Sequence, residues 1–180
     1  MRPGAQPIEG ADPIDSRPTR TDFVTHQPIL ESRAIVWTTE SDCAAFAESL
    51  ARKRGLQEAF IALEGPLGAG KTTFARHLLR ALGASGRIKS PTYALLEPYD
   101  LSGGHASHLD FYRFDDAREW VDAGLREVFE QPGLKLVEWP DKAGALLPTA
   151  DLRLCITPHD DGAREVAVHA QTPRGVELLA

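Results

Sequence analysis

Cysteine is scarce in this sequence, and long apolar runs are absent from it. The 180 residues include two cysteines, Cys43 and Cys155, whose wide separation fits no metal-binding or redox motif and suits a reducing cytosol. No apolar stretch approaches the length of a membrane span or of a signal-peptide core. These absences predict a cytoplasmic protein that has no contact with a membrane.

Basic residues are outnumbered by acidic ones. The chain carries 20 Lys and Arg against 26 Asp and Glu, which gives a formal net charge of -6. A chain with this charge has no overall field that attracts nucleic acid. We therefore expect any connection with RNA to run through a partner protein, although basic residues gather locally at Arg76, Arg80, Arg87 and Lys89.

The length fits one domain with a substantial core and is too short for two ordinary ones. Residues 1–33 hold five of the 13 prolines, mixed charges and almost no hydrophobic periodicity. Such a segment buries too little apolar surface to offset its chain entropy. We therefore expect a disordered N-terminal extension over residues 1–33 and a single folded domain over residues 34–180.

The rest of the chain alternates between helical and strand-like periodicity. An amphipathic helix is expected from Thr39, which opens a Thr-x-x-Asp cap, to Gly55. Further helices are expected over residues 72–83 and 115–129. Strands are expected over residues 59–65, 92–101, 106–114, 134–140, 151–157 and 164–170. This order predicts an α/β fold, a three-layer sandwich whose sheet mixes parallel and antiparallel strands.

Residues 63–74 read LEGPLGAGKTTF and contain the phosphate-binding pattern G-x-x-x-x-G-K-[ST]. The loop lies between a predicted strand and a predicted helix, as the pattern requires. Its glycines let backbone N–H groups point at phosphate oxygens, while a lysine neutralises the β- and γ-phosphates and a hydroxyl binds Mg²⁺. The domain is thus expected to be P-loop NTPase-like. The expected nucleotide-binding residues are Gly65, Gly68, Ala69, Gly70, Lys71, Thr72 and Thr73.

A carboxylate for Mg²⁺ and for the attacking water is expected at the end of a neighbouring strand. Glu138 ends the apolar strand LKLVE and is one candidate. Asp110 is the other, and strand alternation places it on one face with His108 and Tyr112. That face belongs either to the site or to the solvent-exposed surface. His105 and His108 have H-x-x-H spacing, but on a strand and loop they are not expected to converge on zinc.

The segment SPTY at residues 90–93 offers the Thr92 hydroxyl as a sensor of the γ-phosphate. Turn chemistry alone would also explain Ser90 followed by Pro91. The N/T-K-x-D pattern that reads guanine does not occur in the sequence. ATP is therefore expected rather than GTP.

Four segments, GPLGAGKTTFAR, KSPTYALLEPY, HLDFYR and VEWP, occur in this order and together resemble the bacterial TsaE family, formerly YjeE. Members of this family are P-loop ATPases of tRNA threonylcarbamoyladenosine biosynthesis, and the modified tRNAs read codons that begin with adenine. The resemblance covers about residues 35–170. It implies a P-loop ATPase domain over residues 34–180 that acts with the subunits TsaB and TsaD. The chemistry on tRNA then belongs to the partners, and weak, partner-stimulated ATP hydrolysis sustains their turnover.

The resemblance also implies individual roles at matching positions. Lys71 and the loop backbone would hold phosphates, and Thr72 with Glu138 would bind Mg²⁺. Asp110 would position the attacking water, and Thr92 would serve as the switch threonine. Catalysis is thus expected from Asp110, Lys71 and Thr92.

Further contacts follow from the same resemblance. Trp139 matches the tryptophan beside the metal-binding acid. The adenine contacts fall near Glu40 and Ser41 and near residues 162–164, where the sequence is less distinctive.

Two other functions remain compatible with the sequence. A small-metabolite kinase shares the length, the loop and the α/β core. Such kinases close an arginine-bearing lid over the phosphates, yet the segment 139–153 offers one arginine, Arg153, within a predicted strand. A nucleotide-sensing interaction module would bind ATP without needing to hydrolyse it.

Overall fold

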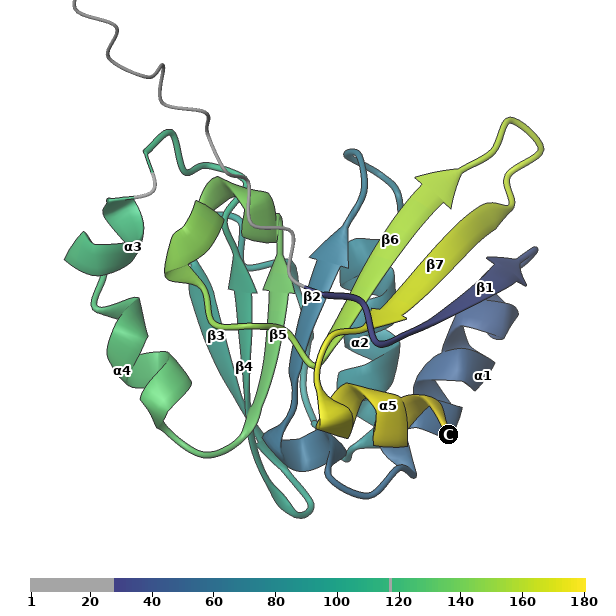
Figure 1. The fold of residues 1–180 in the computed structure, drawn as a ribbon, viewed down its shortest axis with the longest axis horizontal. Coiled ribbons are helices and arrows are strands. Elements are labelled where there is room, and N and C mark those ends of the chain that lie inside the picture. Colours follow the sequence, from purple (N-terminus) through teal and green to yellow (C-terminus); the bar gives the residue numbers. More distant parts are fainter. Residues whose placement is uncertain (1–27, 117) are drawn as a thin grey trace, which may run out of the picture.

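The apolar runs of the sequence become strands of one seven-stranded mixed sheet (Figure 1). The computed structural model describes residues 28–116 and 118–180. The strands lie in the order β1-β7-β6-β2-β5-β4-β3. Their bounds are β1 Glu31–Trp37, β2 Phe60–Glu64, β3 Leu96–Leu101, β4 Gly104–Asp110, β5 Leu134–Glu138, β6 Leu152–Pro158 and β7 Arg164–Ala170.

The four central strands run in the same direction. β2 pairs in parallel with β5 and with β6, and β4 pairs in parallel with β5. The antiparallel strands β3, β7 and β1 extend the sheet on its two sides. The C-terminal ends of β2, β4 and β5 therefore meet at one edge of the sheet, at the top of Figure 1.

Helices cover both faces of the sheet. Their bounds are α1 Glu40–Ala51, α2 Lys71–Ala81, α3 Glu119–Asp122, α4 Leu125–Glu130 and α5 Pro173–Leu179. In Figure 1, α1 and α2 lie behind the sheet, α3 and α4 lie at the left of the view, and α5 lies at the lower edge of the sheet. Residues of α3 and α4 pack with residues of β2, β4 and β5. Short 3-10 helices, η1 Leu56–Glu58, η2 Pro140–Lys142 and η3 Gly144–Leu146, complete the connections. This arrangement confirms the predicted three-layer α/β fold.

The central strand β2 shows why its sequence is apolar without interruption. Ile61 and Leu63 belong to the core cluster that includes α1 and α2 residues, whereas Phe60 and Ala62 belong to the cluster that includes α3 and α4 residues. Because both faces of the strand are covered, neither set of alternate positions is polar. The phosphate loop therefore begins from a strand that is held on both faces.

Several element boundaries differ from those expected. Helix α1 begins after Thr39 with a capping box, as predicted. The helix expected over residues 115–129 is instead divided into α3 and α4, because Gly124 adopts a left-handed conformation between them. β3 begins at Leu96 rather than at residue 92, because residues 91–95 form a turn in which Leu95 N donates to Pro91 O.

Two elements, β1 and α5, lie outside every range expected from the sequence. β1 begins at Glu31, so the expected boundary at residue 33 falls inside a strand that pairs with β7. The backbone partners of β1 come from the far end of the chain, which local periodicity does not reveal. The disorder expected for residues 1–27 falls outside the described residues and stays a prediction.

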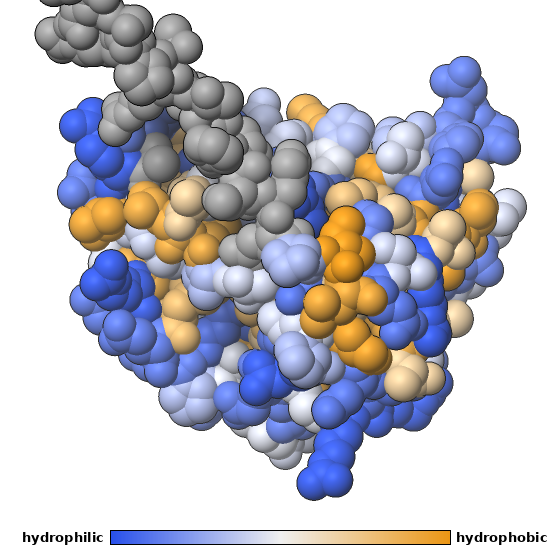
Figure 2. Space-filling view, viewed as in Figure 1, coloured by the Kyte–Doolittle hydropathy of each residue, from blue (hydrophilic) through white to orange (hydrophobic). Residues whose placement is uncertain are grey.

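Some apolar residues are exposed on the face shown in Figure 2. They include residues over the segment that leads into β1, where the exposed side chains are Ile29 and Leu30. Exposed apolar residues are ordinary on protein surfaces, so Ile29 and Leu30 carry no functional argument. In the described part of the chain, no helix is both long and apolar enough to cross a bilayer.

Candidate functional site

The phosphate loop joins the C-terminal end of β2 to the N-terminus of α2. Three of its glycines have positive φ angles, 135° at Gly65, 79° at Gly68 and 113° at Gly70, which side-chain-bearing residues rarely adopt. A Cβ atom at Gly65 would also lie 2.3 Å from the carbonyl oxygen of Ile156. The glycines therefore allow a tight loop that ends at a helix N-terminus, which is an arrangement suited to binding an anion.

The side chain of Lys71 is buried under this loop. Its Nζ donates hydrogen bonds to the carbonyl oxygens of Gly65, at 2.7 Å, and of Pro66, at 2.9 Å. It also lies 3.9 Å from the ring centroid of Trp139. Burial lowers the pKa of Lys71, while the carboxylates of Glu138 and Asp110 oppose that effect. The lysine is thus held by the loop and by the residue that follows β5.

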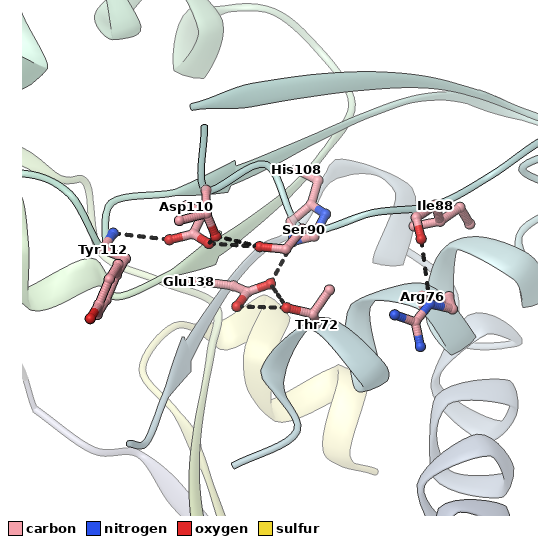
Figure 3. A network of polar contacts seen from close by, with 9 residues as sticks. Thr72, Arg76, Ile88, Ser90, His108, Asp110, Tyr112 and Glu138 are labelled. Carbon is pink, nitrogen blue, oxygen red and sulfur yellow. Dashed lines mark hydrogen bonds and ion pairs between the residues drawn. The ribbon is translucent and has the colours of Figure 1, made fainter. Parts of the chain in front are cut away.

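Thr72 and Glu138 meet where α2 begins and β5 ends (Figure 3). The Thr72 hydroxyl donates to the carboxylate of Glu138, at 2.8 Å from Oε1 and 3.0 Å from Oε2. Glu138 is buried, and its Oε1 lies 2.9 Å from Nε2 of His108. The carboxylate therefore has a partner on α2 and a second partner on β4.

Asp110 lies directly beside Glu138 because the two residues are paired in the β4–β5 register. Its Oδ2 accepts hydrogen bonds from Ser90 Oγ, at 2.9 Å, and from Thr92 Oγ1, at 2.5 Å. Its Oδ1 accepts one from the backbone N–H of Tyr112 at 2.9 Å. The turn that precedes β3 is thus tied to the end of β4 through one buried carboxylate (Figure 3).

Thr72 and Glu138 fit a magnesium ion. Mg²⁺ prefers oxygen donors and is usually bound by one or two carboxylates together with phosphate oxygens and water. Here a hydroxyl and a carboxylate converge beside the phosphate loop. The described residues contain no cluster of three or more His, Cys, Asp or Glu suited to a metal. The donor set would therefore suit Mg²⁺ that is bound jointly with phosphate oxygens.

Two cavities flank the phosphate loop. The first, of about 230 Å³, is lined by Lys71, Thr72, Thr92, Asp110 and Glu138 among others, and the second has about 170 Å³. Gly68, Gly70 and Thr73 line both. Each cavity is smaller than the ~300–1,000 Å³ typical of ligand sites, whereas the two together reach that range. A ligand that crosses the loop would occupy both.

The residues expected from the sequence mostly gather here. Those expected to act in catalysis and to bind metal all line the first cavity. Gly65 is absent from that lining, and its carbonyl oxygen accepts from Lys71. Ala69 lines the second cavity with Glu40 and Arg164, two of the positions expected near adenine, whereas Ser41 and Gly162 are absent from that lining.

The sequence assigned the β4 face that carries His108 and Asp110 either to the site or to the solvent-exposed surface. In the structure this face belongs to the site. His108 and Asp110 are buried and point toward Glu138 and the segment at residues 90–92, while Leu109 and Phe111 pack in the core. The two histidines of the H-x-x-H spacing have different partners, since His105 Nδ1 lies 2.9 Å from Asp100 on the surface.

Sequence reasoning missed several residues of the site. It gave no role to Ser90, which contacts Asp110, or to His108, which contacts Glu138. It also missed Trp37 and Cys43, which line the second cavity. Strand alternation had placed His108 on the face of Asp110, and this signal was sufficient to find it.

Comparisons with known proteins bear on the family to which this chain belongs. The sequence model of the family described as "Threonylcarbamoyl adenosine biosynthesis protein TsaE" matches residues 37–166. The tRNA threonylcarbamoyladenosine biosynthesis protein TsaE of Haemophilus influenzae is 38% identical over 135 residues, which cover 75% of this chain and 85% of that protein. Its namesake in Bacillus subtilis is 37% identical over 110 residues, which cover 61% of this chain and 68% of that protein.

A solved structure has a similar fold. The crystal structure of Bacillus subtilis YdiB superposes with a TM-score of 0.69 at 27% sequence identity, covering 83% of this chain and 92% of that one. The family match includes the phosphate loop, the segment at residues 90–93 and both carboxylates. The chain therefore belongs to the TsaE family.

Proposed function

We propose that this chain binds Mg·ATP and hydrolyses it as the ATPase subunit required to form threonylcarbamoyladenosine in tRNAs that read codons beginning with adenine. It acts in the cytoplasm with TsaB and TsaD, which carry out the chemistry on tRNA. Its own hydrolysis is weak and is stimulated by these partners. The curated relatives, which are named for this biosynthesis, support the pathway.

The proposal rests on one main observation. Two carboxylates from adjacent strands lie beside the phosphate loop and have different hydrogen-bond partners. Glu138 accepts from Thr72 at the start of α2, whereas Asp110 accepts from Thr92 and Ser90. A protein that only anchors phosphate needs the loop alone. A second, differently partnered carboxylate in the same cavity supports hydrolysis, because a water must be oriented toward the γ-phosphate.

The phosphate loop, the two metal-binding residues, Asp110 and Thr92 have separate roles in this proposal. The loop N–H groups and the Lys71 ammonium bind the phosphates and stabilise the charge that develops on them. Thr72 and Glu138 would hold Mg²⁺, which when bound would neutralise negative charge on the nucleotide phosphates. Asp110 accepts a hydrogen bond from the attacking water and orients it. Thr92 exchanges its bond to Asp110 for one to the γ-phosphate and so reports the nucleotide state to the surface.

The surface around the first cavity supports a partner-dependent cycle. Leu67, in the phosphate loop, has 76% of its surface exposed, and Tyr93, next to Thr92, has 90%. The Tyr93 ring contacts the Arg113 guanidinium, with Cζ 4.9 Å from the ring centroid. Exposed aliphatic and aromatic residues together with arginine are typical of protein interfaces. A partner bound here would contact both the phosphate loop and the switch segment.

The alternative of a small-metabolite kinase finds less support. Arg153, the one arginine of the segment 139–153, lies on β6 and donates to Glu64 at 2.8 Å. It is absent from the linings of both cavities at the loop. A nucleotide-sensing module would use the same loop but would not need Asp110 for its function.

ATP hydrolysis by the purified chain, alone and with a TsaB–TsaD complex and tRNA, tests the proposal. We expect slow hydrolysis by the chain alone and a clear increase with the complex. Lys71→Ala is the control, because its residual rate measures contaminating ATPases. Fast hydrolysis that is independent of the partners would contradict the proposal, and phosphate transfer to a metabolite would favour the kinase.

A further inference from the structure

We propose that His108 is a positioning residue that holds the carboxylate of Glu138 in its metal-binding orientation. The inference rests on the proposed function, because it assigns Glu138 to Mg²⁺. His108 lies on β4, and its side chain is fully buried. Its Nε2 lies 2.9 Å from Glu138 Oε1, the same oxygen that accepts from Thr72 at 2.8 Å (Figure 3).

The contacts of the imidazole ring define its tautomer. An ionised carboxylate can only accept hydrogen bonds, so the ring nitrogen that faces Glu138 must carry a proton. The other nitrogen, Nδ1, is buried and has no hydrogen-bond partner among the described residues. A proton on Nδ1 would be left unpaired in the interior, which is unfavourable. The arrangement therefore places the proton of the neutral ring on Nε2.

This contact constrains Glu138 from the side opposite α2. Thr72 reaches the carboxylate from the helix that follows the phosphate loop, and His108 reaches it from the neighbouring strand. A Thr72 hydroxyl that binds a metal does so through an oxygen lone pair, so its proton can still be donated to Glu138. His108 adds a second donor from another element, and together the two contacts keep the carboxylate turned toward the metal. Outer-shell partners of this kind typically change metal affinity by ~10–100-fold when removed.

A purely structural role for His108 makes a different prediction. A histidine that only fills space would change the thermal stability when replaced, and it would change ATP affinity with and without Mg²⁺ by the same factor. A positioning role affects only the metal-dependent part of binding. The two roles are therefore separated by the Mg²⁺ dependence of nucleotide binding at a temperature where every variant is folded.

The test uses a fluorescent ATP analogue, mant-ATP, titrated with the full chain at increasing Mg²⁺ concentrations. For His108→Leu we expect the half-saturating Mg²⁺ concentration to rise ~10–100-fold, with affinity in EDTA changed less than about twofold. His108→Gln places an amide N–H near the position of Nε2 and should largely restore the wild-type value. His105→Leu, on the same strand but exposed and paired with Asp100, is the matched control and should change neither quantity.

The outcomes also separate this inference from the proposed function. If wild-type chain shows no Mg²⁺-dependent binding, the proposed function fails. If the wild-type chain does show Mg²⁺-dependent binding, two results would make the inference wrong. One is that His108→Leu keeps the wild-type Mg²⁺ dependence, and the other is that His108→Gln is as impaired as His108→Leu. ¹⁵N NMR of histidine-labelled wild-type chain is independent of whether any variant folds: a proton on Nδ1 instead of Nε2 overturns the inference.

Discussion

Asp110 and Glu138 are neighbours in the β4–β5 register, yet their hydrogen bonds lead to different parts of the molecule. Glu138 is joined to the start of α2 through Thr72, the residue that follows the phosphate-binding lysine. Asp110 is joined to the turn before β3 through Ser90 and Thr92. Because the partners differ, substitutions at the two carboxylates should have separable effects on metal binding and on hydrolysis.

Replacing Asp110 with Asn should reduce hydrolysis while leaving binding largely intact. The amide oxygen can still accept hydrogen bonds, but it cannot act as a base toward water. We expect partner-stimulated hydrolysis to fall ~10²–10⁴-fold, the usual contribution of a general base. Mg·ATP affinity, measured by calorimetry, should change less than about threefold, because charge is removed outside the Mg²⁺ donor set.

The matched control for this substitution is Asp100→Asn. Asp100 lies on β3, and its side chain is exposed and remote from the phosphate loop. Hydrolysis by this variant should equal that of the wild type. Loss of Mg·ATP affinity in Asp110→Asn comparable with the loss of rate would show that Asp110 serves binding rather than catalysis.

The two cysteines should differ in reactivity and in pH dependence. Burial is the main cause that raises the pKa of Cys43 to about 12, and the nearby Glu40 adds to it. Burial likewise raises the pKa of Cys155 to about 11, with a further contribution from Glu64. The ordinary value is 9.0, so at pH 8 the native thiolate fraction is ~1,000-fold lower at Cys43 and ~100-fold lower at Cys155 than in the unfolded chain. Iodoacetamide should therefore modify Cys155 before Cys43 in the native protein.

The direction of the shift also sets the pH profile of alkylation. A raised pKa keeps the thiol protonated as pH rises, so the native rate at Cys43 should keep rising tenfold per unit above pH 9. The rate in urea should level off there. Mass spectrometry of the two cysteine peptides measures both rates. Modification of native Cys43 at the unfolded rate at pH 8 would contradict the burial of this thiol.

The sequence predicted the phosphate loop, both carboxylates and Thr92 as individual residues, because each belongs to a motif with fixed spacing. It did not predict that Ser90 shares Asp110 with Thr92 or that His108 contacts Glu138. The His108 contact depends on the register between β4 and β5, and the Ser90 contact depends on where the turn before β3 meets the end of β4. Strand register is decided by pairing between segments that lie far apart in the chain, which motif spacing does not report.

The C-terminal helix α5 is connected to the centre of the sheet through Asp151. This buried carboxylate accepts from the backbone N–H of Phe60 at 2.8 Å and from the hydroxyl of Thr172, the N-cap of α5. It also pairs with Arg174 at 3.2 Å. One side chain therefore connects the beginning of β2, which leads to the phosphate loop, with the end of the chain.

Asp151→Ala should destabilise the fold without touching the site. Removing the carboxylate leaves the buried N–H of Phe60 unpaired, at a cost of about 1–3 kcal/mol, and removes a partner of the α5 cap. We expect a total loss of about 2–5 kcal/mol in the free energy of unfolding, measured by urea denaturation. Asp151→Asn keeps an oxygen acceptor and should lose less. Equal stability of the alanine variant and the wild type would contradict this account of α5.

Local periodicity predicted most helices and strands but not their exact limits. The apolar runs of β2 and β5 and the capped start of α1 carry strong local signals. β1 could not be predicted, because its backbone partners come from β7. The division of α3 from α4 at Gly124 had a signal, since a glycine inside a helical pattern weakens the helix and favours a left-handed conformation there.

The sheet order brings the whole site to one edge of the molecule. β2 lies between β5 and β6, so the phosphate loop begins at the centre of the sheet, and the two carboxylates end the next strands on one side. The second cavity lies across the loop, where α1 and the start of β7 contribute Glu40 and Arg164. A bound nucleotide would therefore contact elements from both halves of the sheet.

A ligand that contacts so many elements should stabilise the whole fold. At a concentration of ~100 times the dissociation constant, a ligand that binds only the native state adds about 2.7 kcal/mol. For a chain of this size, that corresponds to a rise in Tm of about 5–11 °C. Differential scanning fluorimetry with Mg·ATP should show this rise, and Lys71→Ala should lose most of it. An unchanged Tm at saturating Mg·ATP would contradict the proposed binding mode.

The central claim is that ATP hydrolysis at this site sustains repeated tRNA modification by the partner subunits. The most direct measurement is the amount of threonylcarbamoyladenosine formed per TsaB–TsaD complex, with wild-type chain or with Asp110→Asn, at saturating Mg·ATP. We predict many rounds of modification with the wild-type chain and at most one round per complex with the variant. Many rounds with the variant, while its hydrolysis is abolished, would contradict the claim and show that nucleotide binding alone is sufficient.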